Sequence, residues 1–143
     1  MEIAHLENDA IEAAVGLWRA VGLTRPWNDP VADLQRALAG SASTVLAGTE
    51  GGRLVATAMV GDDGHRGWVY YLAVAADAQR AGRGRAMMLA CEEWLAQRGV
   101  PKLNVMVRGD NTDARAFYTG LGYGEDDVIV LASRLGEALD RLA

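Results

Sequence analysis

The chain of 143 residues has one cysteine, two histidines and no long hydrophobic run. A single cysteine excludes an intramolecular disulfide and any zinc site built from a cysteine cluster, and two histidines leave little for another metal. We therefore expect no metal. No apolar run approaches the length of a membrane span, and the first residues, Met1-Glu-Ile-Ala-His5, do not begin a signal peptide. These absences favour a cytoplasmic protein with no membrane partner.

Basic residues are also too few for a typical nucleic-acid-binding protein. Lysine and arginine number 14 against 19 aspartate and glutamate, so the formal net charge is −5. Nucleic-acid-binding domains are normally basic, and we expect no nucleic acid partner. Half of the residues are hydrophobic and 23% are charged, which is the balance of a soluble globular protein. The length predicts one domain, residues 1–143, with a sizeable core.

Hydrophobic periodicity predicts an α/β fold in which a mixed sheet is flanked by helices. The expected strands are 1–6, 44–49, 54–60, 68–74, 102–107 and 128–132, and the expected helices are 9–22, 30–38, 87–98, 111–120 and 135–142. Asp9, with Glu12 three residues on, predicts a capping box, and Asp29 before Pro30 predicts an N-cap. The turn Glu50-Gly-Gly-Arg53 predicts a hairpin.

The most informative stretch is Val74–Ala86, between a nearly continuous apolar strand and a helix. It holds two glycines one residue apart and three arginines around them: Gly82, Gly84, Arg80, Arg83 and Arg85. A glycine-rich turn that leads into a helix exposes backbone N–H groups, and the helix dipole and guanidinium groups favour an anion there. Two interpretations are open from these residues: a phosphate or pyrophosphate site, or an ordinary loop with exposed arginines.

Known phosphate-loop fingerprints do not match this stretch. A Walker A loop requires Gly-Lys-Ser/Thr, which is absent, and a dinucleotide fingerprint requires glycine or alanine where Met87 stands. These failures disfavour a nucleotide-binding protein.

Two motifs carry a resemblance to a known family. Gln79-x-x-Gly82-x-Gly84, between a central strand and a helix, resembles the Gln/Arg-x-x-Gly-x-Gly/Ala signature of the GNAT N-acetyltransferases. Downstream, the segment 111–123 matches the family's usual order of Asn, Ala, Phe/Tyr-Tyr and Leu/Phe-Gly-Phe/Tyr, with these residues: Asn111, Ala114, Phe117, Tyr118, Leu121, Gly122 and Tyr123. The likeness covers nearly the whole chain. Residues 25–30, 63–67 and 70–72 are also similar to the YpeA-type acetyltransferases, a subgroup poorly defined in substrate.

The resemblance implies the GNAT fold, a mostly antiparallel mixed sheet whose central strands splay apart, and acetyl-CoA as cosubstrate. The pantetheine arm would lie between those strands and the pyrophosphate against backbone N–H groups of the loop. The implied cofactor-binding residues are Leu72, Ala73, Val74, Gln79, Arg80, Ala81, Gly82, Arg83, Gly84, Arg85, Asn111 and Tyr118. Arg83 departs from the family, which usually has an aliphatic residue there. Either Arg83 turns outward toward phosphate, or the helix start packs differently.

By family position, Tyr118 would protonate the departing thiolate, because a phenol pKa of about 10 lies above a thiol pKa of about 8.5. The alternative is that Tyr118 is a core tyrosine. Asn111 is either a helix N-cap, a cofactor contact or both. A backbone N–H near Leu72 could bind the oxyanion.

The general base is not evident, because Tyr70 and Tyr71 stand where many family members have a glutamate. His65, with an unperturbed pKa of about 6.5, is a candidate base, against the alternative of an exposed loop histidine. Asp62 and Asp63 either act through water or shape the turn.

Four residues are predicted to contact the acceptor: Arg25, Trp27, Tyr70 and Tyr71. Arg25 and Trp27 lie in a region that borders the acceptor site in this family, so Arg25 would pair with a carboxylate and Trp27 would pack. The alternative is that Trp27 anchors its loop in the core. Cys91 is expected to be a buried, inert thiol.

The resemblance implies an N-acetyltransferase that transfers acetyl from acetyl-CoA directly to an amine of a small molecule or a protein. The alternative is a non-catalytic acyl-CoA-binding regulatory domain on the same fold, since the glutamate is missing. The net acidity, with Asp29, Asp62 and Asp63 near the expected site, favours a cationic acceptor. Family habit alone suggests a homodimer.

Overall fold

The computed structural model describes residues 1–136, and its contacts divide the chain into two compact units, Met1–Val107 and Arg108–Ala143. The expectation of a single domain over residues 1–143 stays a prediction.

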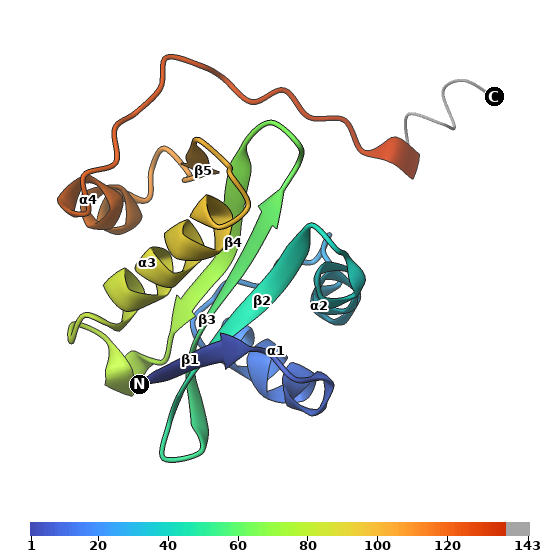
Figure 1. The fold of residues 1–143 in the computed structure, drawn as a ribbon, viewed down its shortest axis with the longest axis vertical. Coiled ribbons are helices and arrows are strands. Elements are labelled where there is room, and N and C mark those ends of the chain that lie inside the picture. The colour runs from blue at the N-terminus through green and yellow to red at the C-terminus, as the bar shows by residue number, and fades with distance from the viewer. Residues whose placement is uncertain (137–143) are drawn as a thin grey trace. The chain divides into compact units, whose positions relative to one another are not determined.

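The first unit contains a mixed sheet, as the sequence predicts, but with five strands instead of the six expected (Figure 1). Its strands follow one another in chain order: β1 (Glu2–His5), β2 (Ser43–Glu50), β3 (Arg53–Asp62), β4 (Gly67–Val74) and β5 (Leu103–Val105). The first four strands pair antiparallel, and β5 pairs parallel with β4. The sheet is therefore mostly antiparallel with one parallel edge strand.

Helices cover both faces of this sheet. They are α1 (Ile11–Ala20), α2 (Pro30–Ala39) and α3 (Arg83–Ala96), with short 3-10 turns η1 (Asn8–Ala10) and η2 (Ala76–Ala78). Side chains of α1 and α2 form one hydrophobic cluster with Val45, Ala47 and Val55 of the sheet. Successive β3 residues from Val55 to Ala58 are all buried, which requires cover on both sides of a pleated strand. Figure 1 shows α3 on the face opposite α1 and α2.

Local sequence signals explain most of the turns and helix ends. Gly51 and Gly52 have φ values of 55° and 78°, the left-handed pair that a two-residue hairpin needs. The Asp29 carboxylate accepts the Ala32 N–H at 3.1 Å and caps α2. The predicted capping box at Asp9 is wrong: the N-cap of α1 is Ala10, because Asp9 lies inside the preceding 3-10 turn.

Helix α3 begins at Arg83, four residues before the predicted Met87, because Gly82 with φ 80° serves as its N-cap. Its predicted apolar face is confirmed, since the following side chains are buried: Met87, Cys91, Trp94 and Leu95. Strand β5 is shorter than the predicted 102–107. Among the helices of residues 1–136, none has the length and apolar character needed to cross a membrane.

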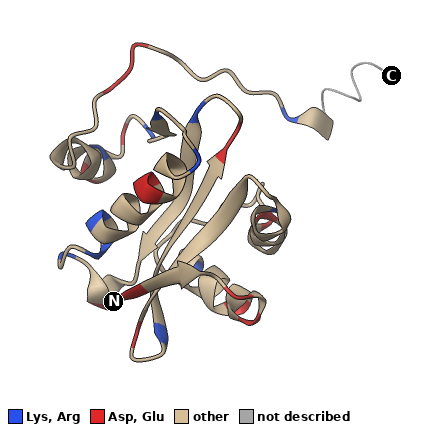
Figure 2. Cartoon of the chain, viewed as in Figure 1, with Lys and Arg blue, Asp and Glu red and all other residues tan. Residues whose placement is uncertain are grey.

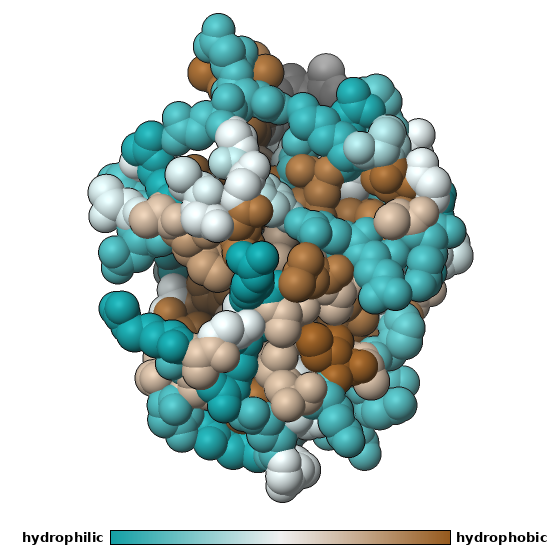
Figure 3. Space-filling model, turned by 60° about the vertical axis from the view of Figure 1, so that its left-hand side comes forward, coloured by the Kyte–Doolittle hydropathy of each residue, from teal (hydrophilic) through white to brown (hydrophobic). Residues whose placement is uncertain are grey.

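The second unit contains α4 (Thr112–Gly120), followed by an extended segment. The predicted strand 128–132 is wrong: no described residue pairs with it as a strand. Its apolar pattern resembled a strand, but Val128–Leu131 are 64–86% exposed. Figure 3 shows that hydrophobic patches on one face of the molecule alternate with hydrophilic ones. The predicted helix 135–142 falls almost wholly outside the described residues, of which Leu135 and Gly136 are helical.

Candidate functional site

The pairing of β4 with β5 covers only the start of β4, because β5 is just three residues long. Their ladder joins Gly67, Trp68 and Val69 to Leu103–Val105 and ends there. Beyond Val69, β4 pairs with β3 alone among the described residues. The predicted splay of the central strands is thus confirmed, and it leaves one backbone edge of Tyr70–Val74 open.

A bulge in β4 accompanies this separation. Thr57 pairs with Ala73 and Met59 pairs with Tyr70, so that one β3 residue, Ala58, opposes two residues of β4. Tyr71, at the bulge, has a left-handed φ of 53°. A bulge bends its strand, which turns β4 away from β5. A left-handed conformation costs a non-glycine residue about 1–2 kcal/mol, so surrounding contacts must offset this cost.

A network around Tyr71 supplies those contacts. Its ring stacks on Trp18 with centroids 3.7 Å apart and planes 3° from parallel, and its hydroxyl donates to Asp33 at 2.8 Å. The Thr57 hydroxyl donates to the Tyr71 carbonyl at 3.0 Å and accepts the Trp18 indole N–H at 2.8 Å. Burial, and then Asp33, raise the pKa of Tyr71 to about 12. Tyr71 is therefore a neutral residue whose ring and hydroxyl hold the bulge. Its predicted contact with the amine substrate stays a prediction.

The open edge of β4 presents alternate backbone groups. The Ala75 N–H bonds Val55 of β3 at 2.8 Å, so strand alternation directs Ala73 toward β3 and directs Leu72 and Val74 toward the open edge. The Val74 carbonyl accepts the side-chain amide of Gln79 at 2.9 Å. Of the three predicted strand residues, Leu72 and Val74 therefore have backbone groups positioned to meet a ligand.

The loop after η2 runs from Gln79 to Gly82 and leads directly into α3. Arg80 and Gly82 both have left-handed φ values, 64° and 80°, and no side chain caps the helix. The first amides of α3 therefore point out of its N-terminal end. Figure 2 shows basic residues in this loop and first turn. The predicted anion-binding backbone, which includes Ala81, Gly84 and Arg85, is thus joined through Gln79 to the open edge of β4.

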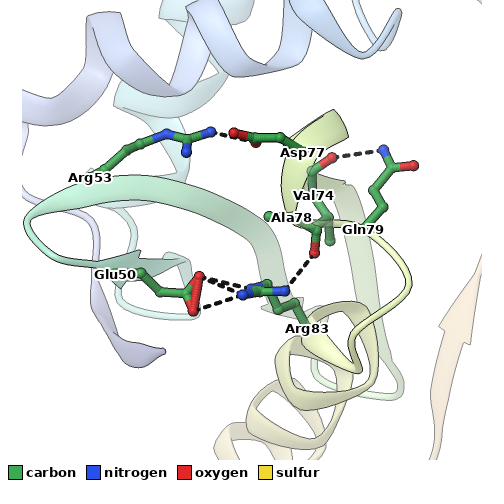
Figure 4. A network of polar contacts seen from close by, with 7 residues as sticks. All are labelled: Glu50, Arg53, Val74, Asp77, Ala78, Gln79 and Arg83. Carbon is green, nitrogen blue, oxygen red and sulfur yellow. Dashed lines mark hydrogen bonds and ion pairs between the residues drawn. The ribbon is translucent and has the colours of Figure 1, made fainter.

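The Arg83 guanidinium turns to the protein instead of outward (Figure 4). Its Nε and Nη2 donate to the two carboxylate oxygens of Glu50 at 2.8 and 3.0 Å, and its Nη1 donates to the Ala78 carbonyl at 2.9 Å. The hydrogen bond from Arg83 is the main cause that lowers the pKa of the Glu50 carboxyl. Of the two alternatives for Arg83, the structure supports the one in which the helix start packs differently.

The candidate base lies in the turn between β3 and β4. His65 is exposed, and its backbone N–H donates to the Asp63 carboxylate at 2.9 Å. Asp63 also accepts from the Arg66 N–H and the Trp68 indole, and these bonds lower the pKa of its carboxyl. The Asp62 carboxylate accepts the Gly64 N–H at 2.7 Å. Both carboxylates shape the turn, as one alternative predicts.

The remaining candidates of the first unit lie at the surface. The Arg25 guanidinium donates to the carbonyls of Gly22 and Thr24 at 2.8 and 2.9 Å, so it fixes its own loop. Trp27 is 53% exposed, which argues against its anchoring the loop in the core. Tyr70 is exposed as well, and partial burial followed by the Asp63 charge raises its pKa.

Two candidates belong to the second unit. The Asn111 side chain accepts the Ala114 N–H at 3.1 Å, which confirms the predicted N-cap of α4. Tyr118 lies on α4 and is half-buried, with its ring 5.0 Å from that of Phe117 and 5.6 Å from that of Tyr123.

Two partners in the site were not identified from the sequence. Asp33 and Glu50 lie far along the chain from Tyr71 and Arg83, and no local motif marks either carboxylate. Only the charge of Arg83 at a usually aliphatic position signalled that a partner was needed.

Comparisons with known proteins agree with this architecture. The model of the acetyltransferase (GNAT) family matches residues 7–123. An acetyltransferase of Yersinia pestis (strain Pestoides F) is 41% identical over 135 residues, which cover 94% of this chain and 96% of the relative. An acetyltransferase of Sodalis glossinidius is 41% identical over 138 residues, or 96% and 97% of the two chains.

Solved structures share the fold at lower identity. The aminoglycoside N-acetyltransferase AAC(6')-Iy in complex with CoA superposes with a TM-score of 0.81 at 15% identity, covering 93% of each chain. A ribosomal-protein-alanine N-acetyltransferase from Brucella melitensis gives 0.74 at 20% identity, covering 93% of this chain and 98% of the other. The family model and the two 41% identical relatives show that the chain belongs to the GNAT acetyltransferase family.

Proposed function

We propose that the protein transfers the acetyl group of acetyl-CoA directly to an amine, without a covalent enzyme intermediate. One observation carries the proposal: the open backbone edge of β4 after Val69 continues, through the Gln79 side chain, into the glycine loop and the first turn of α3. Strand amides beside a helix N-terminus suit a ligand that joins an amide-bearing arm to a pyrophosphate. Family membership points to the same cosubstrate.

The cosubstrate would be held mainly by backbone. The N–H groups of the Arg80–Gly84 stretch would bind the pyrophosphate, and the open-edge groups of Leu72 and Val74 would bind the pantetheine arm. Neither role depends on the Arg83 side chain, which is engaged elsewhere. The family resemblance adds Asn111 as a proposed cofactor contact, beyond its role as N-cap.

The reaction forms a bond between the amine nitrogen and the acetyl carbon and breaks the carbon–sulfur bond. The amine must first be neutral, and at a pKa of about 10.4 only about one lysine-like amine in a thousand is neutral near pH 7.4. A less polar site, or a base acting through water, raises that fraction. The proton lost by the amine passes to solvent or to His65. The Leu72 N–H would stabilise the oxyanion, and Tyr118 would protonate the thiolate.

The acceptor is proposed to be a cationic amine, in a small molecule or a protein. The structural neighbours include enzymes named for aminoglycosides and for the alanine of a ribosomal protein, both of which present amines. The carboxylates of Asp29, Asp62 and Asp63 accept local hydrogen bonds, so they do not by themselves support a cationic acceptor. The remaining electrostatic support for a cationic acceptor is the net charge of −5. A cytoplasmic location and a homodimer are proposed on the sequence and on family habit alone.

The first experiment measures thermal unfolding with acetyl-CoA, CoA, ATP and NAD side by side. A ligand that binds only the folded protein, at about 100 times its dissociation constant, stabilises it by about 2.7 kcal/mol. A shift with acetyl-CoA and CoA alone supports the proposal, and no shift with either would refute it. Turnover of acetyl-CoA against a panel of amines then separates an enzyme from the non-catalytic acyl-CoA-binding alternative.

Tyr118→Phe tests the proposed acid. Loss of a proton donor typically costs 10²- to 10⁴-fold in rate, so we expect kcat to fall at least about 100-fold. The affinity for CoA should change little, because the ring remains. Tyr123→Phe is the matched control, since it removes the same hydroxyl from a ring 5.6 Å away. Equal activity in the Tyr118 and Tyr123 variants would exclude Tyr118 as the acid.

A further inference from the structure

The hairpin that joins β2 to β3 is tied by two ion pairs to the elements on either side of the glycine loop, η2 and α3 (Figure 4). Glu50, at the end of β2, bonds Arg83 through both carboxylate oxygens. Arg53, at the start of β3, bonds Asp77 of η2 at 2.6 Å. The pairs differ in their surroundings: the side chains of Arg83 and Glu50 are 25% and 33% exposed, and those of Arg53 and Asp77 are 56% and 66% exposed.

The Arg83 side chain closes the loop on itself. It belongs to the first residue of α3, and its Nη1 returns to the Ala78 carbonyl at the last residue of η2. The segment between these two points contains both left-handed residues, Arg80 and Gly82. Arg80 has a side chain in a conformation that favours glycine, so this shape requires support from outside the loop. The bidentate bond to Glu50 fixes the guanidinium in the orientation that reaches Ala78.

On the basis of the proposed function, we propose that Glu50 and Arg83 are positioning residues that hold the glycine loop in the shape that binds the pyrophosphate of CoA. In this proposal, the Arg83 side chain supports the backbone of the loop, and the backbone N–H groups of the loop bind the phosphate. Three of the five guanidinium N–H donors are directed to Glu50 and Ala78, so most of the hydrogen-bonding capacity of Arg83 is used within the protein. The aliphatic residue usual in this family would lack this link.

Glu50→Gln tests the link with CoA itself as the probe, measured by isothermal titration calorimetry. Glutamine cannot accept a bidentate, charge-assisted pair, so the loop loses its support and we expect the Kd for CoA to rise about five- to tenfold. Arg83→Leu removes the same link from its other end and is expected to have a similar effect. The double variant should bind CoA no more weakly than either single variant, because both changes break one interaction.

Arg53→Gln is the matched control. It removes an ion pair of the same kind from the same hairpin, but both partners are more than half exposed and neither bonds the loop backbone. Such pairs contribute little, and we expect less than a twofold change in Kd.

A kinetic comparison separates positioning from a general loss of structure. With an acceptor from the amine panel, kcat/KM for acetyl-CoA should fall in Glu50→Gln while kcat at saturation stays unchanged. S-acetylpantetheine lacks the pyrophosphate, so its kcat/KM should be the same in the variant and the unaltered protein. A parallel loss with both thioesters would overturn the proposal.

Two further results would also overturn it. If Glu50→Gln bound CoA more tightly and with a steeper salt dependence, the released guanidinium would be a phosphate ligand instead of a support. If the unaltered protein bound CoA and both single variants bound it equally well, this inference would fail while the proposed function stood. Failure of the unaltered protein to bind CoA would refute the proposed function itself.

Discussion

Replacing Thr57 with valine tests whether one buried hydroxyl holds the β4 bulge. Valine keeps the shape of the side chain and removes both hydrogen bonds of the hydroxyl. The Trp18 indole N–H, fully buried, loses its acceptor, and the Tyr71 carbonyl loses its donor. A buried polar group left without a partner costs about 1–3 kcal/mol. The bond to the Tyr71 carbonyl is only partly buried, so its loss costs less than the loss of the buried bond to Trp18. For the two bonds together we expect a loss of about 3 kcal/mol in the free energy of unfolding.

Thermal and urea unfolding measure this loss. For a domain of this size, about 3 kcal/mol corresponds to a fall of about 10 °C in Tm. Thr57→Ser retains the hydroxyl and should lose about 1 kcal/mol at most, the cost of one methyl group. Thr44→Val is the matched control, because within residues 1–136 its hydroxyl bonds only His5, which is exposed and can bond water instead.

The reasoning would be refuted if Thr57→Val and Thr44→Val lost the same stability. It would also fail if Thr57→Ser were as unstable as Thr57→Val, since the hydroxyl would then not be the cause.

Two further predictions concern the core around α3. A β-carbon at Gly67 would collide with the methyl groups of Leu95, one of them 2.7 Å away, so Gly67→Ala should lose about 1–3 kcal/mol in urea unfolding. Gly16→Ala is the control, because nothing lies within 4 Å of the β-carbon that it adds in α1. This variant should gain up to about 1 kcal/mol in the free energy of unfolding. Equal destabilisation by the two variants would contradict the packing argument. Burial raises the pKa of Cys91 to about 12. Its thiol should therefore resist iodoacetamide at pH 8 in the native protein and react after unfolding. Rapid alkylation of the native protein would contradict this prediction and show that α3 opens.

Much of the first unit could be predicted because its signals are local. Paired glycines at 51–52 set the hairpin, Asp29 and Pro30 set the start of α2, and the apolar spacing of α3 set its buried face. The splay also followed from the sequence, but only through the family resemblance. Neither the bulge at Tyr71 nor its cause could be predicted, because the bulge depends on residues distant in sequence that meet only in the fold.

The failed predictions share a different cause. Asp9 fits a capping box by spacing, yet a 3-10 turn before the helix moves the N-cap to Ala10. The stretch Val128–Leu131 has the composition of a strand, but a strand also needs a partner, and composition does not supply one. Arg83 stands out as a departure from the family pattern, but its partner Glu50, distant in sequence, could not be identified from the sequence.

The chain-order arrangement of the sheet has a consequence for how the protein folds. Strands β2, β3 and β4 are joined by the short turns 51–52 and 63–66, whereas β1 reaches β2 across residues 6–42, and β5 reaches β4 across residues 75–102. The entropy lost in closing a loop grows with its length, so short-range pairings form at lower entropic cost. The central three strands can therefore pair before either edge strand is recruited. Of the contacts that hold the bulge at Tyr71, the Thr57 hydrogen bond lies within this early meander, whereas Trp18 and Asp33 belong to the long 6–42 connection and complete the support later.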